Sequence, residues 1–188
     1  AHRKLAVPGS EKFDNRGISY CASCDGAFYQ KRDVAVIGGG NSALDDALLL
    51  SEICNKVYLI HRRAEFRGDA STLEKLEQKE NVEIIRNAKV QEIVGEKKAE
   101  KLLLDTGVTL EIQGIFVAIG MIPQTEAVKD LVTLDESGYI KAGEDGITSE
   151  SGFFVAGDVR TKELRQIITA AADGANAANS AIQYIIRK

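Results

Sequence analysis

Residues 34–60 contain a strand, a glycine-rich turn, a helix and a second strand in close succession. Residues 34–37 are a short apolar run rich in β-branched side chains, which suits a buried parallel strand. Residues 38–40 are glycines that break the run, and residues 42–53 then carry apolar or small side chains three or four positions apart, as a helix packed along one face does. Residues 57–60 form the second strand. A unit of about 30 residues in this order is a βαβ crossover, so we predict an α/β fold around a parallel sheet.

The segment after this unit changes character. Residues 72–80 predict a second helix and residues 82–85 a third strand. Short apolar runs separated by polar or glycine turns then follow, and they predict an antiparallel meander laid over the parallel sheet. These runs are residues 89–94, 102–104, 109–112 and 115–119.

A boundary is expected near residue 120, because residues 120–123 read Gly-Met-Ile-Pro, a sequence typical of a linker. Beyond it, residues 138–141 and 153–156 are strand-like, and residues 164–186 predict a long helix with an alanine-rich face. The tail that contains them is short for an independent domain.

The charge balance narrows the class of protein. The 188 residues include 24 Lys and Arg against 28 Asp and Glu, a net charge of −4. Nucleic-acid binding needs a basic face that displaces counterions, so this balance argues against a nucleic-acid partner. No apolar run approaches the roughly 18 residues that cross a bilayer, so we expect no membrane association. The positive charge instead gathers locally, at residues 61–67.

Gly38, Gly40 and Ala43 form the spacing G-x-G-x-x-A, directly after the predicted strand and at the start of the predicted helix. The first glycine permits the tight turn, the second lets the backbone approach a pyrophosphate, and the third small residue lets helix and strand pack closely. Backbone N–H groups at the helix start then face the phosphate. A strand–helix turn without any ligand has the same spacing, but its place between strand and helix favours a dinucleotide site.

The end of the second strand indicates which dinucleotide. An NAD site usually carries Asp or Glu there, whereas this strand ends in His61, Arg62 and Arg63, with Arg67 four residues on. Guanidinium groups bind a 2′-phosphate through bidentate charge-assisted bonds, and a carboxylate would repel it. His61 is expected to stack on adenine or to add a donor. A solvated basic turn is the alternative, but the position 23 residues after Gly38 favours NADP.

Cysteine usage points to redox chemistry in a reducing compartment, so we predict a cytoplasmic location. Cys21 and Cys24 are spaced as a C-x-x-C pair that fits a reversible disulfide within one helical turn, and Asp25 follows as a candidate proton carrier. A zinc half-site lacks a second half here, so we expect no metal. Two inert buried cysteines and a helix-turn carboxylate are the structural alternatives. Cys54 lies at the apolar end of the first predicted helix and is expected in the core.

NADPH and a disulfide do not react directly with each other. A nicotinamide gives a hydride, whereas a disulfide is opened by a thiolate or a carbanion-like group, and a flavin is the usual intermediary. We therefore expect FAD as a second cofactor.

The sequence resembles the low-molecular-weight thioredoxin reductases at five places, in family order and over nearly the whole chain. These are CASCDGAFY at 21–29, VIGGGNSA at 36–43, HRRAEFR at 61–67, FVAIG at 116–120 and AGDV at 156–159. Related flavoproteins, such as the alkyl hydroperoxide reductase flavoprotein, share the cysteine and glycine motifs but not the basic one.

The resemblance implies an FAD/NAD(P)-binding Rossmann-like fold in three layers and two sets of cofactor residues. The implied NADP-binding residues are Gly38, Gly39, Gly40, Asn41, Ser42, Ala43, His61, Arg62, Arg63, Arg67, Ile119 and Gly120. The implied FAD-binding residues are Gly157, Asp158, Val159, Arg165, Gln166 and Ile167.

The resemblance also implies an enzyme that passes electrons from NADPH to FAD, to the Cys21–Cys24 disulfide and then to thioredoxin. Cys24 is expected to face the flavin, Cys21 to attack the disulfide of thioredoxin, and Asp25 to handle the proton. Hinges at residues 120–123 and 9–16 are expected to let two domains rotate, so that nicotinamide and cysteines take turns at the flavin.

Family members are longer and begin with another glycine-rich fingerprint, which holds the ADP half of FAD. The resemblance therefore implies residues 1–8 as a remnant or linker of the FAD domain, residues 9–120 as the NADPH-binding domain with the C-x-x-C pair, and residues 121–188 as a C-terminal FAD-domain segment. We expect this chain to be inactive alone, with FAD binding doubtful. The alternative is an NADPH-binding redox-sensor module without flavin or turnover.

The tail also predicts a homo-oligomer. On the resemblance, its apolar side chains complete a sheet whose other strands are absent, so they are exposed unless another chain covers them. They include Phe153, Phe154, Ile167, Ile168 and the alanine-rich residues 170–181. A patch of this kind usually marks an interface, so self-association is expected.

Overall fold

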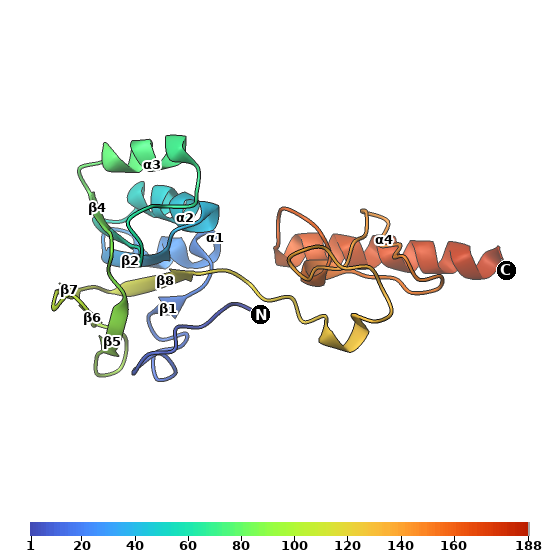
Figure 1. Ribbon diagram of the computed structural model, residues 1–188, viewed down its shortest axis with the longest axis horizontal. Helices are drawn as coiled ribbons and strands as arrows, with labels where there is room; N and C mark the ends of the chain where they lie inside the picture. The colour runs from blue at the N-terminus through green and yellow to red at the C-terminus, as the bar shows by residue number, and fades with distance from the viewer. Residues whose placement is uncertain (188) are drawn as a thin grey trace. The chain divides into compact units, whose positions relative to one another are not determined.

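The computed structural model describes residues 1–187, which form two compact units (Figure 1). The larger unit is His2–Gly120, and the smaller one comprises the residues from Met121 onward together with Ala1. Residues 2–8, expected to be a remnant or linker, belong to the larger unit, where Leu5 and Val7 pack against its core.

A five-stranded parallel sheet forms the centre of the larger unit, with the strand order β1-β8-β2-β3-β4. Its strands are β1 (Ile18–Ser19), β2 (Asp33–Gly38), β3 (Lys56–Ile60), β4 (Val82–Ile85) and β8 (Gly114–Ala118). The prediction of an α/β fold around a parallel sheet is therefore confirmed.

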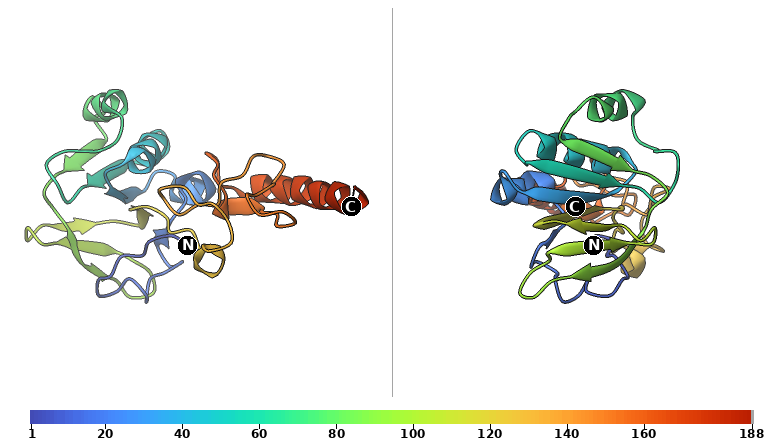
Figure 2. Two further views of the ribbon diagram at one scale, coloured as in Figure 1. Left: turned by 45° about the vertical axis from the view of Figure 1, so that its right-hand side comes forward. Right: turned by 90° about the vertical axis from the view of Figure 1, so that its left-hand side faces the viewer.

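Two further layers cover the sheet, one on each face (Figure 2). Helices pack on one face: α1 (Ala22–Asp25), the 3₁₀ turn η1 (Gly26–Tyr29), α2 (Asn41–Ser51) and α3 (Ala70–Glu77). A three-stranded antiparallel sheet packs on the other: β5 (Val90–Val94), β6 (Lys101–Leu104) and β7 (Thr109–Glu111).

The alternation of side chains along β2 connects these layers. Val34 and Val36 point into the core beneath the helices, whereas Ala35 and Ile37 point into the core beneath the antiparallel sheet. Both faces of the strand are thus buried, as its continuous apolar run predicts. Cys54 is 7% exposed, which confirms its expected place in the core beneath the helices.

One strand lies in a different sheet from the one expected. The sequence predicts the run at 115–119 as the last strand of the antiparallel meander, but β8 lies in the parallel sheet between β1 and β2. Ile115, Phe116 and Val117 are all at most 3% exposed, because a strand with neighbours on both edges and layers on both faces has no solvent-facing side.

The smaller unit has little regular structure before its long helix. It contains the 3₁₀ turns η2 (Glu126–Val128) and η3 (Gly157–Val159), and the helix α4 (Ile167–Ile186). The strands expected at 138–141 and 153–156 are absent from the described chain, and only isolated bridges occur there, such as Leu134 with Ile140. No helix within residues 1–187 combines the length and apolar character needed to span a bilayer.

The long helix begins three residues later than expected. Gln166 is its N-cap, and Gln166 and Thr169 form a reciprocal capping box that satisfies backbone donors of the first turn. This cap fixes the helix start at Ile167, whereas apolar periodicity alone predicts a start at residue 164.

Candidate functional site

A cavity of about 430 Å³ opens in the larger unit at the carboxyl ends of β2, β3 and β8. Ligands of open parallel sheets bind outside the carboxyl ends of the strands, at the point where the strand order reverses direction. The cavity gathers most of the residues expected to bind NADP, from three separate segments of the sequence. These are Gly38, Gly39, Gly40, Asn41, Ser42, His61, Arg62, Arg67, Ile119 and Gly120.

The glycine loop, defined as residues 38–41, joins β2 to α2. A side chain at Gly38 would lie 2.4 Å from the Ala118 carbonyl oxygen and 2.7 Å from the methyl group of Ala43, so only glycine fits this turn. Ala43 itself is fully buried and does not line the cavity, as the packing role of the third small residue predicts. A Cβ at Gly40 would meet nothing within 4 Å, so this backbone borders open space in which a phosphate fits.

The basic segment, defined as residues 61–69, follows β3. Arg62 and Arg67 line the cavity, whereas Arg63 is exposed and does not. His61 is only 6% exposed, and its ring lies against Gly39, where an added Cβ would come within 2.2 Å of it. Burial, followed by the neighbouring arginines, lowers the pKa of His61. A neutral imidazole packed under the glycine loop leaves the arginines as the cations of this segment.

Two further cations line the cavity that no motif singled out. Arg3 lies beside Gly120, and its backbone N–H donates to the Gly120 carbonyl at 3.0 Å. Lys89 follows β4 and lines the cavity next to Ala88 and Val90. Among the residues described, the lining therefore holds four Arg and Lys side chains and no carboxylate.

Cys21 and Cys24 form a disulfide in the same compact unit, with Cα atoms 5.3 Å apart. Cys21 is the N-cap of α1, and the backbone N–H of Cys24 donates to its sulfur at 3.2 Å. Cys24 is exposed and Cys21 partly buried. The Ser19 hydroxyl, in a residue that is 5% exposed, donates to a carboxylate oxygen of Asp25 at 2.6 Å and so holds this acid at the end of α1.

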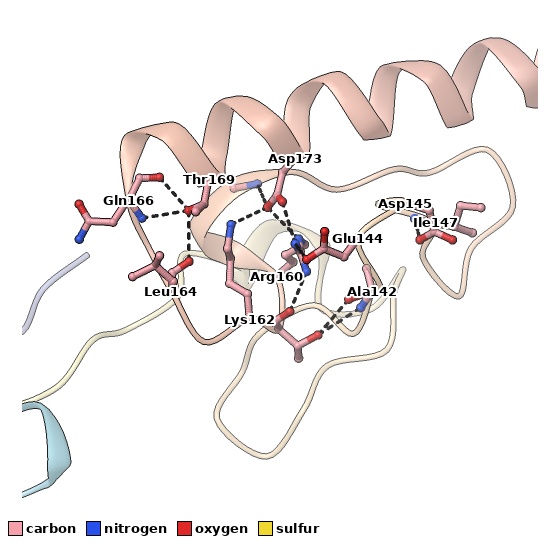
Figure 3. Close-up of polar contacts among 12 residues, drawn as sticks. Ala142, Glu144, Asp145, Ile147, Arg160, Lys162, Leu164, Gln166, Thr169 and Asp173 are labelled. Carbon is pink, nitrogen blue, oxygen red and sulfur yellow. Dashed lines mark hydrogen bonds and ion pairs between the residues drawn. The ribbon is translucent and has the colours of Figure 1, made fainter.

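The residues expected to bind FAD lie in the smaller unit, around η3 and the start of α4. Of these residues, Figure 3 labels Gln166, at the start of α4. Asp173 joins these elements: its carboxylate accepts from the Gly157 backbone N–H at 3.0 Å, from Arg160 Nε at 2.7 Å and from Lys162 Nζ at 2.9 Å. These donors lower the pKa of Asp173, with the Arg160 hydrogen bond as the main cause. The N–H of Gly157, a residue expected to bind FAD, is therefore already hydrogen-bonded to Asp173.

Two of the other expected flavin residues are exposed to solvent. Asp158 is exposed, and Ile167 at the start of α4 is 91% exposed. The Arg165 guanidinium lies 4.1 Å from the centre of the Tyr139 ring, and its Nε is buried without a hydrogen-bond partner among the described residues. Residues 1–187 contain no cluster of three or more His, Cys, Asp or Glu that could hold a metal ion.

The parallel sheet, its glycine loop and the bridged C-x-x-C pair together are typical of the enzymes that link nicotinamide nucleotides to disulfides. Residues 1–174 match the family described as pyridine nucleotide-disulphide oxidoreductase, and the chain belongs to this family.

Individual relatives are similar over nearly the whole chain. The thioredoxin reductase of Listeria innocua is 40% identical over 190 residues, covering 98% of this chain and 60% of that protein. A component of the alkyl hydroperoxide reductase of Staphylococcus aureus is 41% identical over 190 residues, covering 98% of this chain and 38% of that protein. The crystal structure of thioredoxin reductase from Streptococcus pyogenes matches with a TM-score of 0.93 and 39% identity, covering 100% of this chain and 63% of that one. The chain thus spans about 60% of the length of the thioredoxin reductases it matches.

Proposed function

We propose that this chain carries the NADPH site and the redox-active disulfide of an FAD-dependent thioredoxin–disulfide reductase. The observation that carries the proposal is the presence of a bridged Cys21–Cys24 pair and a basic dinucleotide cavity in one compact unit. Either feature alone has structural explanations, whereas a nucleotide that gives two electrons and a disulfide that takes two are chemically complementary.

The charge of the cavity supports NADPH as the electron donor. NADPH differs from NADH by a 2′-phosphate, which Arg62 and Arg67 can bind and which an acidic lining would repel. The open space at Gly40 suits the pyrophosphate, and Arg3 and Lys89 add positive charge at the remaining sides. The same lining would accept NADH without using either arginine, so we expect NADPH to bind more tightly.

The position of the cysteines supports separate roles for the two sulfurs. Once the pair is reduced, the Cys24 N–H stabilises negative charge on the Cys21 sulfur, so Cys21 is the thiolate that attacks a substrate disulfide. That attack forms a mixed disulfide and releases one substrate thiolate. Cys24 gives its proton to Asp25 and, as a thiolate, attacks the Cys21 sulfur, which restores the internal disulfide and frees the second substrate thiolate. Asp25 passes that proton to a released substrate thiolate.

The smaller unit offers groups that fit part of a flavin. The groups we expect to hold it are the Arg165 Nε, which has no hydrogen-bond partner within residues 1–187, the exposed Asp158 and the exposed start of α4 at Ile167. Bound FAD supplies a two-electron relay between a hydride donor and a disulfide.

The choice of thioredoxin as substrate rests on the basic segment. Identity does not separate the candidates, because the relative named as a thioredoxin reductase and the one named as a component of alkyl hydroperoxide reductase are 40% and 41% identical to this chain. The His61-Arg62-Arg63 motif is the feature by which we assign the thioredoxin reductase group.

The visible absorption spectrum and anaerobic NADPH addition test this function. In a full-length protein that contains this sequence and is loaded with FAD, we expect a flavin band that NADPH bleaches, followed by NADPH-dependent reduction of thioredoxin. A Cys21→Ser variant should keep the bleaching and lose thioredoxin reduction. A full-length protein that contains this sequence, is loaded with FAD and still fails to reduce thioredoxin would overturn the assignment.

The alternative is an NADPH-binding redox-sensor module without flavin. A colourless protein that binds NADPH and shows a redox-dependent partner would favour that alternative. In either case we propose a cytoplasmic location, because a reversible cysteine pair and a free buried Cys54 suit a reducing compartment.

We further propose self-association through α4. Five isoleucines of this helix are 54–91% exposed: Ile167, Ile168, Ile182, Ile185 and Ile186. Exposed apolar surface on this scale is uncommon in a monomer. We expect concentration-dependent association in sedimentation velocity, and a monomeric profile at high concentration would contradict it.

A further inference from the structure

The glycine loop and the basic segment are linked at several points besides the cavity they share. The Arg67 N–H donates to the Gly39 carbonyl at 2.7 Å, and the Asp69 N–H donates to the side-chain oxygen of Asn41 at 2.8 Å. Between these bonds, a Cβ at Gly68 would lie 3.0 Å from the Gly40 carbonyl carbon, so the two segments are in close backbone contact.

Asp69 extends this connection to α3. Its backbone N–H binds Asn41, while its carboxylate caps the helix by accepting from the Thr72 N–H at 2.8 Å and from the Ser71 hydroxyl at 2.6 Å. These hydrogen bonds, led by that of Ser71, lower the pKa of Asp69. The start of α3 is thereby tied to the first residue of α2.

We infer that Asn41 and Asp69 are positioning residues that fix the basic segment for recognition of the 2′-phosphate. This inference rests on the proposed NADPH site. Arg67 lies two residues before Asp69, so the Asn41–Asp69 bond and the Gly39–Arg67 bond hold the backbone from which its side chain extends.

The energetic reason is the entropy of the arginines. A guanidinium on a fixed backbone loses less conformational freedom on binding phosphate than one on a mobile loop. NAD⁺ lacks the 2′-phosphate, so its affinity does not depend on how much conformational freedom the arginines lose. Loss of the Asn41–Asp69 bond should therefore weaken NADP⁺ binding and leave NAD⁺ binding nearly unchanged. A role of Asn41 in contacting the pyrophosphate would instead weaken both nucleotides equally, because both contain that group.

Isothermal titration with NADP⁺ and NAD⁺ on the complete chain tests this inference, and it requires no turnover. For Asn41→Ala we expect the NADP⁺/NAD⁺ affinity ratio to fall roughly fivefold, the effect of one hydrogen bond of about 1 kcal/mol. Asn55→Ala is the matched control, since it also deletes one exposed side-chain hydrogen bond, to Asp33 at 2.6 Å, at the amino ends of the strands. This control should leave the ratio unchanged.

A second pair of variants removes the donor instead of the acceptor. The φ of Asp69 is −60°, which proline adopts, so Asp69→Pro deletes the N–H together with the cap, whereas Asp69→Ala deletes the cap alone. We expect the ratio to fall further in Asp69→Pro than in Asp69→Ala. Adding Asn41→Ala to Asp69→Pro should lower the NADP⁺/NAD⁺ affinity ratio no further than Asp69→Pro alone, because both substitutions remove the same hydrogen bond.

The outcomes separate the inference from the function on which it rests. An unchanged ratio in Asn41→Ala, or an equal loss for both nucleotides, overturns the positioning role while leaving the NADPH site intact. A wild-type protein that binds NAD⁺ as tightly as NADP⁺ overturns the NADPH assignment and the positioning role together.

Discussion

Replacing Asp173 with Asn tests what holds the smaller unit together. The Asp173 side chain is 6% exposed and accepts from two nitrogens of Arg160, each at 2.7 Å, as well as from Lys162 and the Gly157 backbone (Figure 3). The Arg160 and Lys162 side chains are themselves only 5% and 8% exposed. An amide in place of the carboxylate leaves two buried cations with, among the described residues, only the exposed Glu144 carboxylate as an ion-pair partner, 3.8 Å from Arg160.

The free-energy cost of Asp173→Asn is large compared with the free energy of unfolding of the smaller unit. Removing one partner of a buried ion pair costs about 3–5 kcal/mol. A unit of this length, at about 0.05–0.15 kcal/mol per residue, has roughly 3–10 kcal/mol in total. Its apolar core is small: Val132, Ile140 and Val155 are the buried members of its hydrophobic cluster, and Ala177 of α4 is buried as well. We therefore expect Asp173→Asn to unfold the smaller unit in a large fraction of molecules, while the larger unit remains folded.

Hydrogen exchange read by mass spectrometry measures the two units separately. A loss of about 4 kcal/mol corresponds to roughly 1,000-fold faster exchange in α4, with residues 33–60 unchanged. Glu144→Gln is the control, because Glu144 lies 3.8 Å from the same Arg160 with its side chain 92% exposed. We expect that exposed partner to contribute less than about 1 kcal/mol. Wild-type exchange rates in α4 of Asp173→Asn would refute the reasoning.

Three further outcomes are expected in the larger unit. Burial and a neighbouring carboxylate raise the pKa of Asp46 to about 6, so Asp46→Asn should stabilise the protein by about 3 kcal/mol at pH 7.5 and by much less at pH 4. Equal urea midpoints for the variant and the wild type at pH 7.5 would contradict this. Burial raises the pKa of Cys54 to about 11, so the reduced native protein should give two thiols with a colorimetric reagent at pH 8 and the unfolded protein three. Gly39→Ala should weaken NADP⁺ binding by at least about tenfold through its clash with the His61 ring, and adding His61→Ala should restore part of the affinity if that clash is the cause.

The sequence predicts the larger unit well wherever periodicity and turn chemistry agree. The apolar run at 34–37, the glycines after it and the spacing of Ala43, Ala47 and Leu50 all indicate one βαβ unit, and all three helix positions are fully buried. β1 was missed because a strand of two residues has no period to detect. The run at 115–119 gives a strand correctly, but a local pattern does not say which of two sheets a strand joins.

The strand predicted at 138–141 does not form, and the reason is local. Asp135 accepts the N–H groups of Ser137 and Tyr139 at 2.9 and 2.8 Å, and Gly138 adopts a left-handed φ of +87°. These bonds satisfy the backbone inside a turn, which competes with a strand ladder. The backbone of Ile140 therefore pairs only through isolated bridges, while its side chain packs in the small core.

In the candidate site, the residues that belong to local motifs could be predicted from the sequence, and those brought in by the tertiary fold could not. Gly40, Arg62 and Arg67 belong to motifs whose chemistry follows from residue type and spacing. Arg3 and Lys89 reach the cavity only because the chain folds back: one is bound to the end of β8 through the Gly120 carbonyl, and the other follows β4. Neither stands in a recognisable pattern, so only the tertiary structure identifies them.

We expect the smaller unit to lose stability in acid before the larger one. Asp173 has a lowered pKa, so its stabilisation is fully present above its unfolded value near 3.8 and is lost as the pH falls below it. Asp46 has a raised pKa, so ionisation disfavours the folded larger unit above about pH 6, and this penalty disappears as the pH falls toward 4. Two carboxylates of the larger unit with lowered pKa values oppose this gain: the solvent-exposed Asp69, whose contribution is small, and Asp14, which is hydrogen-bonded to Lys4. Acid titration should therefore open the helix α4 and the turn at Gly157 before the nucleotide cavity is lost, since two extensive apolar cores hold that cavity and carboxylate chemistry does not.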